Sequence, residues 1–224
     1  MAVDVVVPAH NEAPRIAPVL SAIRGASELG KLIVVADDCD DDTAGIAERY
    51  ADELIVIPAH DKGSAMAAGL DKVRTDMVAF VDADIEGLTP AHVDALLTLP
   101  PHDGQLVGLR SGYPAWSGIF PSVSGERRIP TWLACSVRLR DSGWRAETLI
   151  NVAVAKAGLP WRHVKFVGVT NLAKGKIVNH PYAWADEFAR VIDIWLMYSP
   201  ELITYMRHPN GRSTQAGGTT PAAD

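Results

Sequence analysis

The chain has 224 residues, of which 48% are hydrophobic and 21% are charged, and its formal net charge is −6. This length and composition suit one well-buried domain, and two full domains are not expected. The net acidity argues against a surface built for nonspecific binding to nucleic acid or anionic lipid, so we expect small or neutral partners and no nucleic acid.

The pattern of the first residues and the small number of cysteines both favour a cytoplasmic location. Residues 1–10 lack a basic segment and carry Asp4 within an apolar run, which is typical of a first strand and not of a signal peptide. No stretch reaches the length of an uncharged membrane span. Cys39 and Cys135 are too few for a disulfide framework. We therefore expect a cytoplasmic protein, with peripheral contact at the membrane left open.

Short apolar runs alternate with helical patterns along the first half of the chain. Runs rich in Val and Ile predict strands at Val3–Val7, Leu32–Ala36, Leu54–Ile57, Met77–Val81 and Leu106–Leu109. Helical spacing of apolar residues predicts helices around Ile16–Ile23, Ile46–Tyr50, Ala65–Val73 and Pro90–Leu99. This alternation predicts an α/β fold, a Rossmann-like open and mostly parallel sheet with helices on both faces.

The second half is less regular. We expect helices near Ile129–Cys135 and at Arg145–Ala157, a returning strand at His163–Val169, and two apolar-faced helices within Trp184–Met206. Residues 209–224 have the composition of a disordered tail. We therefore predict a single domain at 1–208, divided into parts at 1–110 and 111–180 and C-terminal helices at 181–208.

Asp82 and Asp84 are two carboxylates one residue apart, at the end of the apolar run Met77–Val81. A parallel strand delivers its carboxyl end to the ligand crevice of an open sheet, where two acidic groups repel unless a cation or protons intervene. Mg²⁺ or Mn²⁺ would suit this pair, with substrate phosphate oxygens as further ligands. A solvated acidic turn is the alternative.

Polar residues follow four predicted strands, at Pro8–Glu12, Asp37–Asp42, His60–Lys62 and Asp82–Glu86. All these loops open on one edge of the predicted sheet. The run after the second strand is not an EF-hand loop, because Thr43 stands where Gly is needed and Arg49 where Glu is needed. Capping by Asp41 or Asp42 explains most of that run. Asp37, nearest the strand, is the candidate contact to a nucleobase or ribose.

Lys62-Gly63 opens a predicted helix, where a lysine opposes the helix dipole unless a phosphate lies between them. A surface lysine in a turn is the alternative. Neither a Walker A sequence nor a Gly-x-Gly-x-x-Gly fingerprint is present, which disfavours an ATPase or an NAD enzyme.

Taken in order, the motifs Val5-Val6-Val7-Pro8-Ala9-His10-Asn11-Glu12, Val34-Val35-Ala36-Asp37-Asp38, Lys62-Gly63 and Val81-Asp82-Ala83-Asp84 resemble family 2 glycosyltransferases of the GT-A fold. The resemblance covers the first half and implies a hexosyltransferase that uses a nucleoside-diphosphate sugar. It implies a nucleotide site formed by Pro8, Ala9, Asn11, Glu12, Asp37, Lys62, Asp82 and Ala83. It also implies Mg²⁺ or Mn²⁺ held by Asp82, Asp84 and Glu86, of which Glu86 matches a ligand position of polyprenyl-phosphate-mannose synthases.

The second half is similar to such enzymes more loosely. Gly143-Trp144-Arg145-Ala146-Glu147 resembles an acceptor-side element of glucosyl-phosphoglycerate synthases, and Ser124-Gly125-Glu126-Arg127 one of the polyprenyl-phosphate enzymes. By resemblance the acceptor would contact Arg110, Gly125, Arg127 and Trp144. Glu147 is the candidate general base, with a carboxylate that stabilises a helix N-terminus as the alternative. The histidine ligand that some relatives place after Val169 is missing, and His180 leaves the third metal ligand open.

The arginines Arg110, Arg127 and Arg128 favour an anionic acceptor, either a small phosphate ester or a lipid phosphate. The alternative is that they pair with Glu126, Asp141 or the donor diphosphate. Two rival functions are a sugar-phosphate nucleotidyltransferase and a non-catalytic nucleotide-binding module. The apolar stripe of Phe188, Val191, Ile192 and Trp195 favours packing on the core or on a homodimer partner over lipid.

Overall fold

A computed structural model describes residues 2–111 and 124–171, without the side chains of Trp144 and Asn171. The predictions for His180, for the helices of Trp184–Met206 and for the tail lie outside these residues.

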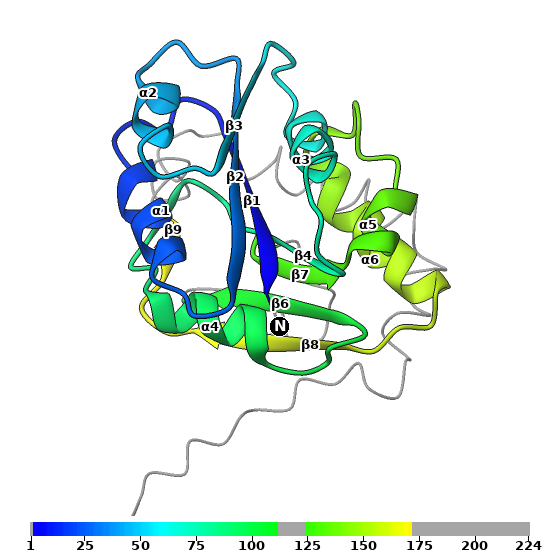
Figure 1. The fold of residues 1–224 in the computed structure, drawn as a ribbon. Coiled ribbons are helices and arrows are strands. Elements are labelled where there is room, and N and C mark those ends of the chain that lie inside the picture. The colour runs from blue at the N-terminus through cyan, green and yellow to red at the C-terminus, as the bar shows by residue number, and fades with distance from the viewer. Residues whose placement is uncertain (1, 112–123, 172–224) are drawn as a thin grey trace, which may run out of the picture.

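One mixed sheet forms the centre of the described fold, with the strand order β3-β2-β1-β4-β7-β6-β8 (Figure 1). Its strands are β1 Val3–Ala9, β2 Leu29–Asp37, β3 Glu53–Ile57, β4 Met77–Phe80, β6 Gln105–Arg110, β7 Arg127–Pro130 and β8 Trp161–Phe166. Strand β7 runs antiparallel to both of its neighbours, whereas the other paired strands are parallel. A separate antiparallel pair joins β5 Ile85–Glu86 to β9 Thr170–Asn171.

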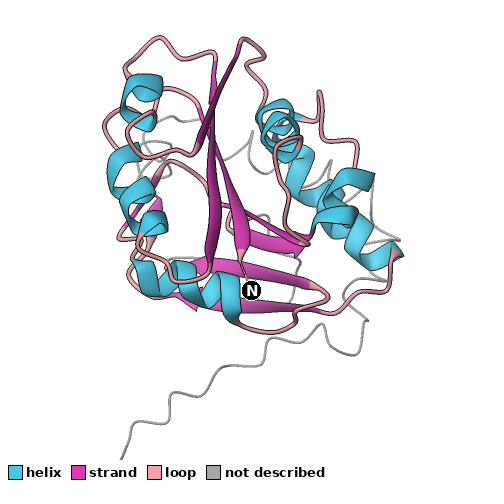
Figure 2. Ribbon diagram, in the orientation of Figure 1, coloured by secondary structure: helices cyan, strands magenta, loops and turns pink. Residues whose placement is uncertain are grey.

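Helices cover both faces of the sheet (Figure 2). They are α1 Ile16–Arg24, α2 Thr43–Ala47, α3 Lys62–Leu70, α4 Pro90–Thr98, α5 Thr131–Ser136 and α6 Ala146–Lys156. Successive residues of β1 point to opposite faces, so Val5 and Val7 pack with α1, α2 and α4, and Val6 packs with α3, α5 and α6. The helices on both faces of the sheet therefore pack against β1.

The predicted α/β class and the strands of the first half are confirmed. The prediction of a helix from Ile129 was wrong at its start, because Arg127–Pro130 pairs with β4 and β6 and α5 begins only at Thr131. The returning strand is β8, which ends at Phe166 and not at Val169. None of the helices in the described ranges is long and apolar enough to cross a membrane.

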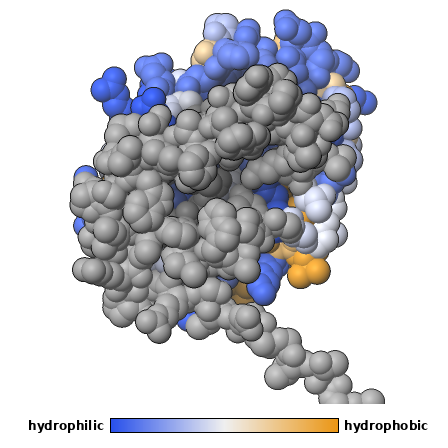
Figure 3. All heavy atoms as spheres, turned by 180° about the vertical axis from the view of Figure 1, so that it is seen from behind, coloured by the Kyte–Doolittle hydropathy of each residue, from blue (hydrophilic) through white to orange (hydrophobic). Residues whose placement is uncertain are grey.

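The carboxyl ends of β1 to β4 meet at one edge of the sheet, where the loops with the conspicuous polar residues follow them. Seen from behind, the atoms in view at the top of the molecule are mainly hydrophilic (Figure 3). An open parallel sheet binds ligands at this edge. The fold therefore brings the polar motifs of the first half together.

Candidate functional site

A cleft of about 390 Å³ lies at this edge of the sheet. It is lined by Pro8, Ala9, His10, Glu12, Asp37, His60, Asp61, Lys62, Asp82, Ala83 and Asp84. The structure thus brings together most of the residues predicted to bind the nucleotide. Asn11 is not among the lining residues. Its side-chain oxygen accepts a hydrogen bond from the Asp40 backbone, and so it joins the loops after β1 and β2.

Lys62 is the central cation of the cleft. Its Nζ lies 2.7 Å from Asp82 Oδ1 and 2.6 Å from Glu147 Oε1. Burial opposes the charge on Lys62, but the two carboxylates outweigh it and hold the pKa of Lys62 above its ordinary value. Lys62 begins α3, as predicted, and its ammonium joins the end of β4 to the first turn of α6.

Asp82 is enclosed on several sides. Besides Lys62, it faces Arg110, whose Nη2 lies 3.7 Å from Asp82 Oδ2. Burial works against the Asp82 carboxylate, yet these two cations outweigh it and keep the pKa of Asp82 below its ordinary value. Gly125 packs directly on the carboxylate, since a Cβ at residue 125 would stand 2.0 Å from Asp82 Oδ1. Asp82 is therefore an ionised side chain with little room to move.

Asp84 lies beside Asp82 in the cleft, and its Oδ1 is 4.0 Å from Arg110 Nη1. Two carboxylates that open on a cleft are a donor set that fits a hard divalent cation such as Mg²⁺ or Mn²⁺. Glu86 does not complete this set, because it is exposed on β5 and does not line the cleft. Asp82, Asp84 and Glu86 are also not a cluster with ligand atoms within 4.8 Å of one another. The predicted third carboxylate ligand is thus not brought to the pair.

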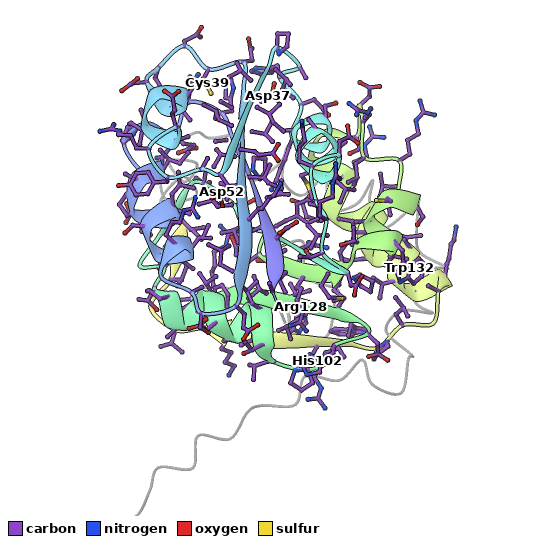
Figure 4. The ribbon with its side chains drawn as sticks, in the orientation of Figure 1. Asp37, Cys39, Asp52, His102, Arg128 and Trp132 are labelled. Carbon is purple, nitrogen blue, oxygen red and sulfur yellow. The ribbon has the colours of Figure 1, made fainter. Side chains whose placement is uncertain are left out.

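Asp37 is buried and holds the loop between β3 and α3. Its carboxylate accepts hydrogen bonds from the backbone N–H groups of Ala59, His60 and Asp61, at 2.7–2.8 Å. It lines the cleft and is therefore within reach of a ligand. Its carboxylate nevertheless has a structural role, because it holds three backbone N–H groups of this loop. The sequence predicted only a contact with the nucleobase or ribose. Figure 4 shows Asp37 at the same end of the molecule as Cys39.

Glu12 also lines the cleft. Arg15 Nη2 lies 2.6 Å from Glu12 Oε2. Burial raises the pKa of Glu12, against the opposing effect of Arg15. The Glu12 backbone N–H donates to Thr43 Oγ1, which fixes this turn against the start of α2. Glu12 therefore presents a carboxylate already paired with a cation.

Arg110 is the arginine that faces the acidic pair. Its Nε also lies 3.3 Å from Glu126 Oε2, and the same carboxylate accepts a hydrogen bond from the Ser124 hydroxyl. Burial raises the pKa of Glu126, and Arg110 offsets this only in part. Pairing of Arg110 with Glu126, one of the two alternatives considered from the sequence, is thus observed.

The expectation of three guanidinium groups in one cleft was wrong. Arg127 and Arg128 are adjacent in β7, so their side chains leave opposite faces of the sheet, and both are at most 1% exposed. Arg127 donates to the backbone carbonyls of Ser124 and Glu147. Arg128 donates to carbonyls at the end of α4 and beyond it, those of Leu97, Leu99 and Pro101. Arg127 is buried and does not line the cleft, so its position does not agree with the predicted contact to the acceptor.

Glu147 lies in the first turn of α6, as predicted, with its side chain 4% exposed. Trp144 lies in the 3-10 turn Gly143–Arg145 that precedes this helix. Asp61 was not among the predicted site residues. It caps α3 by accepting a hydrogen bond from the Ser64 backbone N–H, and it also accepts one from the Gly143 N–H at 2.6 Å. An aspartate three residues before a serine at a helix start was the available signal for the cap. Asp61 thus joins α3 to the turn that carries Glu147.

His10 and His60 were also missed as lining residues. Their rings meet edge to face, with centroids 4.6 Å apart. Each stands in one of the polar loops after β1 and β3, which was the available signal. Their contact could not be read from residues so far apart in the sequence.

Comparison with known proteins identifies the half of the chain that forms this cleft. Residues 4–95 match the model of Glycosyl transferase family 2. This part of the chain is similar to family 2 glycosyltransferases. It extends from β1 to α4 and contains Lys62, Asp82 and Asp84, whereas Arg110 and Glu147 lie beyond the match.

Two curated relatives match the same half. An uncharacterized glycosyltransferase of Mycobacterium tuberculosis is 39% identical over 83 residues, which are 37% of this chain and 37% of the relative. The 4,4'-diaponeurosporenoate glycosyltransferase of Staphylococcus aureus is 32% identical over 102 residues, 43% of this chain and 27% of the relative. The chain thus matches only 37% and 27% of the length of these two relatives.

Solved structures resemble the chain over more of its length. Glucosyl-3-phosphoglycerate synthase from Mycobacterium tuberculosis, in complex with Mn²⁺, UDP and glucosyl-3-phosphoglycerate, has a TM-score of 0.66 and 21% identity and covers 93% of this chain and 81% of its own. Mannosyl-3-phosphoglycerate synthase from Rubrobacter xylanophilus has a TM-score of 0.67 and 20% identity, with 90% and 75% covered. These likenesses establish the GT-A fold of the chain.

Proposed function

We propose that this protein is a metal-dependent glycosyltransferase that moves a sugar from a nucleoside-diphosphate sugar to an acceptor. The observation that carries the proposal is the position of Lys62 between Asp82 and Glu147. Lys62 and Asp82 belong to the family 2 segment, and Glu147 lies beyond it. Two parts of the chain with separate sequence signals therefore meet at one charged group.

In the donor half, Pro8, Ala9 and Glu12 line the space that we assign to the nucleotide, with Asp37 at the nucleobase. Asp82 and Asp84 would hold Mg²⁺ or Mn²⁺. The metal, when bound, would neutralise the charge that builds on the leaving diphosphate. The solved neighbours carry Mg²⁺ or Mn²⁺ together with UDP, which supports this assignment.

Lys62 and Arg110 supply fixed positive charge at the same place. Both are nearly enclosed by protein, with side chains 14% and 6% exposed, so their attraction for a diphosphate would be weakly screened. Groups that are in position before the reaction cost no reorganisation as charge develops. We assign to them the stabilisation of the leaving group.

Glu147 is our candidate for the base that takes the proton of an acceptor hydroxyl. A carboxylate that contacts Lys62 lies beside the group assigned to the diphosphate, and so it is near the bond to be broken. A diphosphate would offer Lys62 a third anionic partner besides Asp82 and Glu147, which would loosen its hold on Glu147. Donor binding and the exposure of the base would then be linked.

The proposed acceptor is a small phosphate ester. The solved neighbours include complexes with phosphoglyceric acid, and Arg110 presents a guanidinium at the acidic pair, the side chain best suited to a phosphate. Because Arg110 also stabilises the leaving diphosphate in this proposal, we expect Arg110→Ala to lower kcat/KM for both acceptors, and to lower it about 10-fold to 100-fold further for the phosphorylated form. Equal values of kcat/KM for the two acceptors on the wild type would refute a site that reads phosphate. A higher kcat/KM for a lipid phosphate than for a small phosphate ester would make the lipid phosphate the acceptor.

We propose that residues 1–208 form one domain, with a nucleotide-binding donor half at 1–110, an acceptor half at 111–180 and C-terminal helices at 181–208. Strands β6, β7 and β8 extend the sheet that begins with β1 to β4, which supports a single unit. A cytoplasmic location, peripheral contact with a membrane and a homodimer stay predictions from the sequence.

Isothermal titration with UDP and GDP, with and without Mn²⁺, tests the function directly. We expect one nucleotide to bind with strong metal dependence, and that dependence to be lost in Asp84→Asn. Asp103→Asn, at an exposed carboxylate outside the cleft, is the matched control. Sugar release from a nucleoside-diphosphate sugar would then separate a transferase from a binding module. Release of diphosphate from a nucleoside triphosphate and a sugar phosphate would favour the nucleotidyltransferase.

A further inference from the structure

Three side chains at the rim of the cleft form a cluster that the proposed reaction does not use. They are His10 after β1, Asp38 after β2 and His60 before α3, each exposed to solvent. One ligand atom from each lies within 4.8 Å of the other two. Within residues 2–111 and 124–171, this is the single group of three or more His, Cys, Asp or Glu side chains gathered so closely.

The spacing in the cluster suits a shared metal ion. His60 Nδ1 lies 3.0 Å from Asp38 Oδ2. Two ligands that bind one tetrahedral zinc ion at ordinary bond lengths stand roughly 3.3 Å apart. This pair is therefore within about 0.3 Å of the separation in a zinc site, and the imidazole of His10 offers a ligand atom within 4.8 Å of both.

The orientation of His10 also favours metal binding. Its Nδ1 lies 2.7 Å from the backbone carbonyl oxygen of Asp37. A carbonyl oxygen only accepts hydrogen bonds, so Nδ1 carries the hydrogen in this contact. Nε2, which lies 3.3 Å from Asn11 Nδ2, is then the nitrogen that can bind a metal. Metal-binding histidines commonly donate their other ring nitrogen to a carbonyl or carboxylate in this way, which fixes the tautomer.

The backbone beneath the ligands is held in place. The Asp38 N–H donates to Ile57 O at 2.7 Å, and the His60 N–H donates to the buried Asp37 carboxylate at 2.8 Å. Only side-chain torsions therefore have to adjust when an ion binds, which limits the entropy cost of forming the site.

We propose that His10, Asp38 and His60 form a zinc site, separate from the carboxylate pair of Asp82 and Asp84. Two imidazoles and one carboxylate favour Zn²⁺ over Mg²⁺ or Mn²⁺, which prefer oxygen ligands. Three protein ligands leave one position of a tetrahedral ion open to water or to a ligand in the cleft. Because both histidines line the cleft, bound zinc would narrow its entrance. An effect of zinc on donor binding rests on the proposed function, but zinc binding itself does not.

The test is calorimetric titration of the full chain with Zn²⁺ in buffer that contains excess Mg²⁺. We expect one zinc site in the wild type, weakened at least about tenfold in His10→Ala and in His60→Ala. His102→Ala is the matched control, since His102 is exposed and lies at the opposite end of the molecule from Asp37 (Figure 4). Its zinc affinity should equal that of the wild type.

Asp84→Asn separates the two metal sites and should leave zinc affinity unchanged. Absence of zinc binding in the wild type would overturn the proposal. So would a loss of zinc affinity in Asp84→Asn with none in His60→Ala. Because all three ligands are exposed, we expect unchanged melting temperatures for the metal-free variants, which would show that they fold.

Discussion

Gly125 lies against Asp82 so closely that any side chain at residue 125 would overlap the aspartate carboxylate. A Cβ there would stand 2.0 Å from Oδ1 and 2.2 Å from Cγ. Asp82 cannot turn away freely, because Lys62 and Arg110 hold its two oxygens. The loop before β7 therefore sets the position of a proposed metal ligand.

The first prediction is that Gly125→Ala displaces Asp82 and weakens Mn²⁺-dependent nucleotide binding. Overpacking of this kind costs about 1–3 kcal/mol, and urea unfolding should reveal a similar loss of stability. Gly45→Ala is the control. The three atoms nearest to its Cβ would all belong to the carboxylate of Asp42, which is exposed and can rotate away. Normal metal dependence in Gly125→Ala would mean that Asp82 does not hold the metal.

The second prediction concerns Glu147. Glu147→Gln keeps the size of the side chain and an oxygen that can accept from Lys62, but it removes basicity. We expect kcat to fall by about 10²–10⁴, with little change in donor affinity, as for the loss of a general base. Glu48→Gln, at an exposed carboxylate outside the cleft, should behave as the wild type. A nearly normal kcat would leave Glu147 with a structural role at the start of α6.

The third prediction separates Arg128 from the acceptor site suggested by the sequence. Its guanidinium binds carbonyl oxygens at and beyond the end of α4, and burial lowers its pKa to about 10. Arg128→Met leaves these carbonyls without their donors inside the protein. We expect the free energy of unfolding to fall by about 2–4 kcal/mol, measured by urea denaturation. KM for the acceptor should stay within about twofold of the wild-type value wherever the variant is folded. A higher KM for the acceptor with an unchanged free energy of unfolding would instead support a contact between Arg128 and the acceptor.

The first half of the fold could be predicted because its strands consist mainly of apolar residues. Strand β7 could not, since Arg127 and Arg128 occupy two of its four positions and suggest an exposed loop. Both guanidinium groups are buried because backbone carbonyls from distant segments accept their hydrogen bonds. Such partners are set by tertiary structure, and a local pattern does not contain them.

The candidate site was predictable to a similar extent. Motifs at strand ends identified most of the lining residues, because parallel strands deliver their carboxyl ends to one edge. The contact of Lys62 with Glu147 could not be derived in the same way, since it depends on how α6 packs beside α3. The hydrogen bonds of Asp37 with backbone N–H groups and the contact between His10 and His60 also depend on tertiary packing, so they could not be predicted from the sequence.

The last prediction is a pH dependence of stability that arises from His163 in β8. Its side chain packs against Trp161, with ring centroids 4.9 Å apart, and neither ring nitrogen has a hydrogen-bond partner within the described part of the chain. Burial, aided by the nearby charge of Arg127, lowers the pKa of His163 to about 4 from its ordinary value of 6.5. The folded state thus binds the proton more weakly than the unfolded state does.

Stability from the neutral His163 ring is therefore complete above about pH 6.5 and is lost as the pH falls toward 4. The loss should reach about 2–3 kcal/mol in the free energy of unfolding. Phenylalanine keeps an aromatic ring but cannot bind a proton, so His163→Phe should lose less stability than the wild type between these two pH values. Urea unfolding of both proteins at pH 7 and at pH 4.5 measures the difference. Equal losses in the two proteins would show that His163 does not titrate in this range.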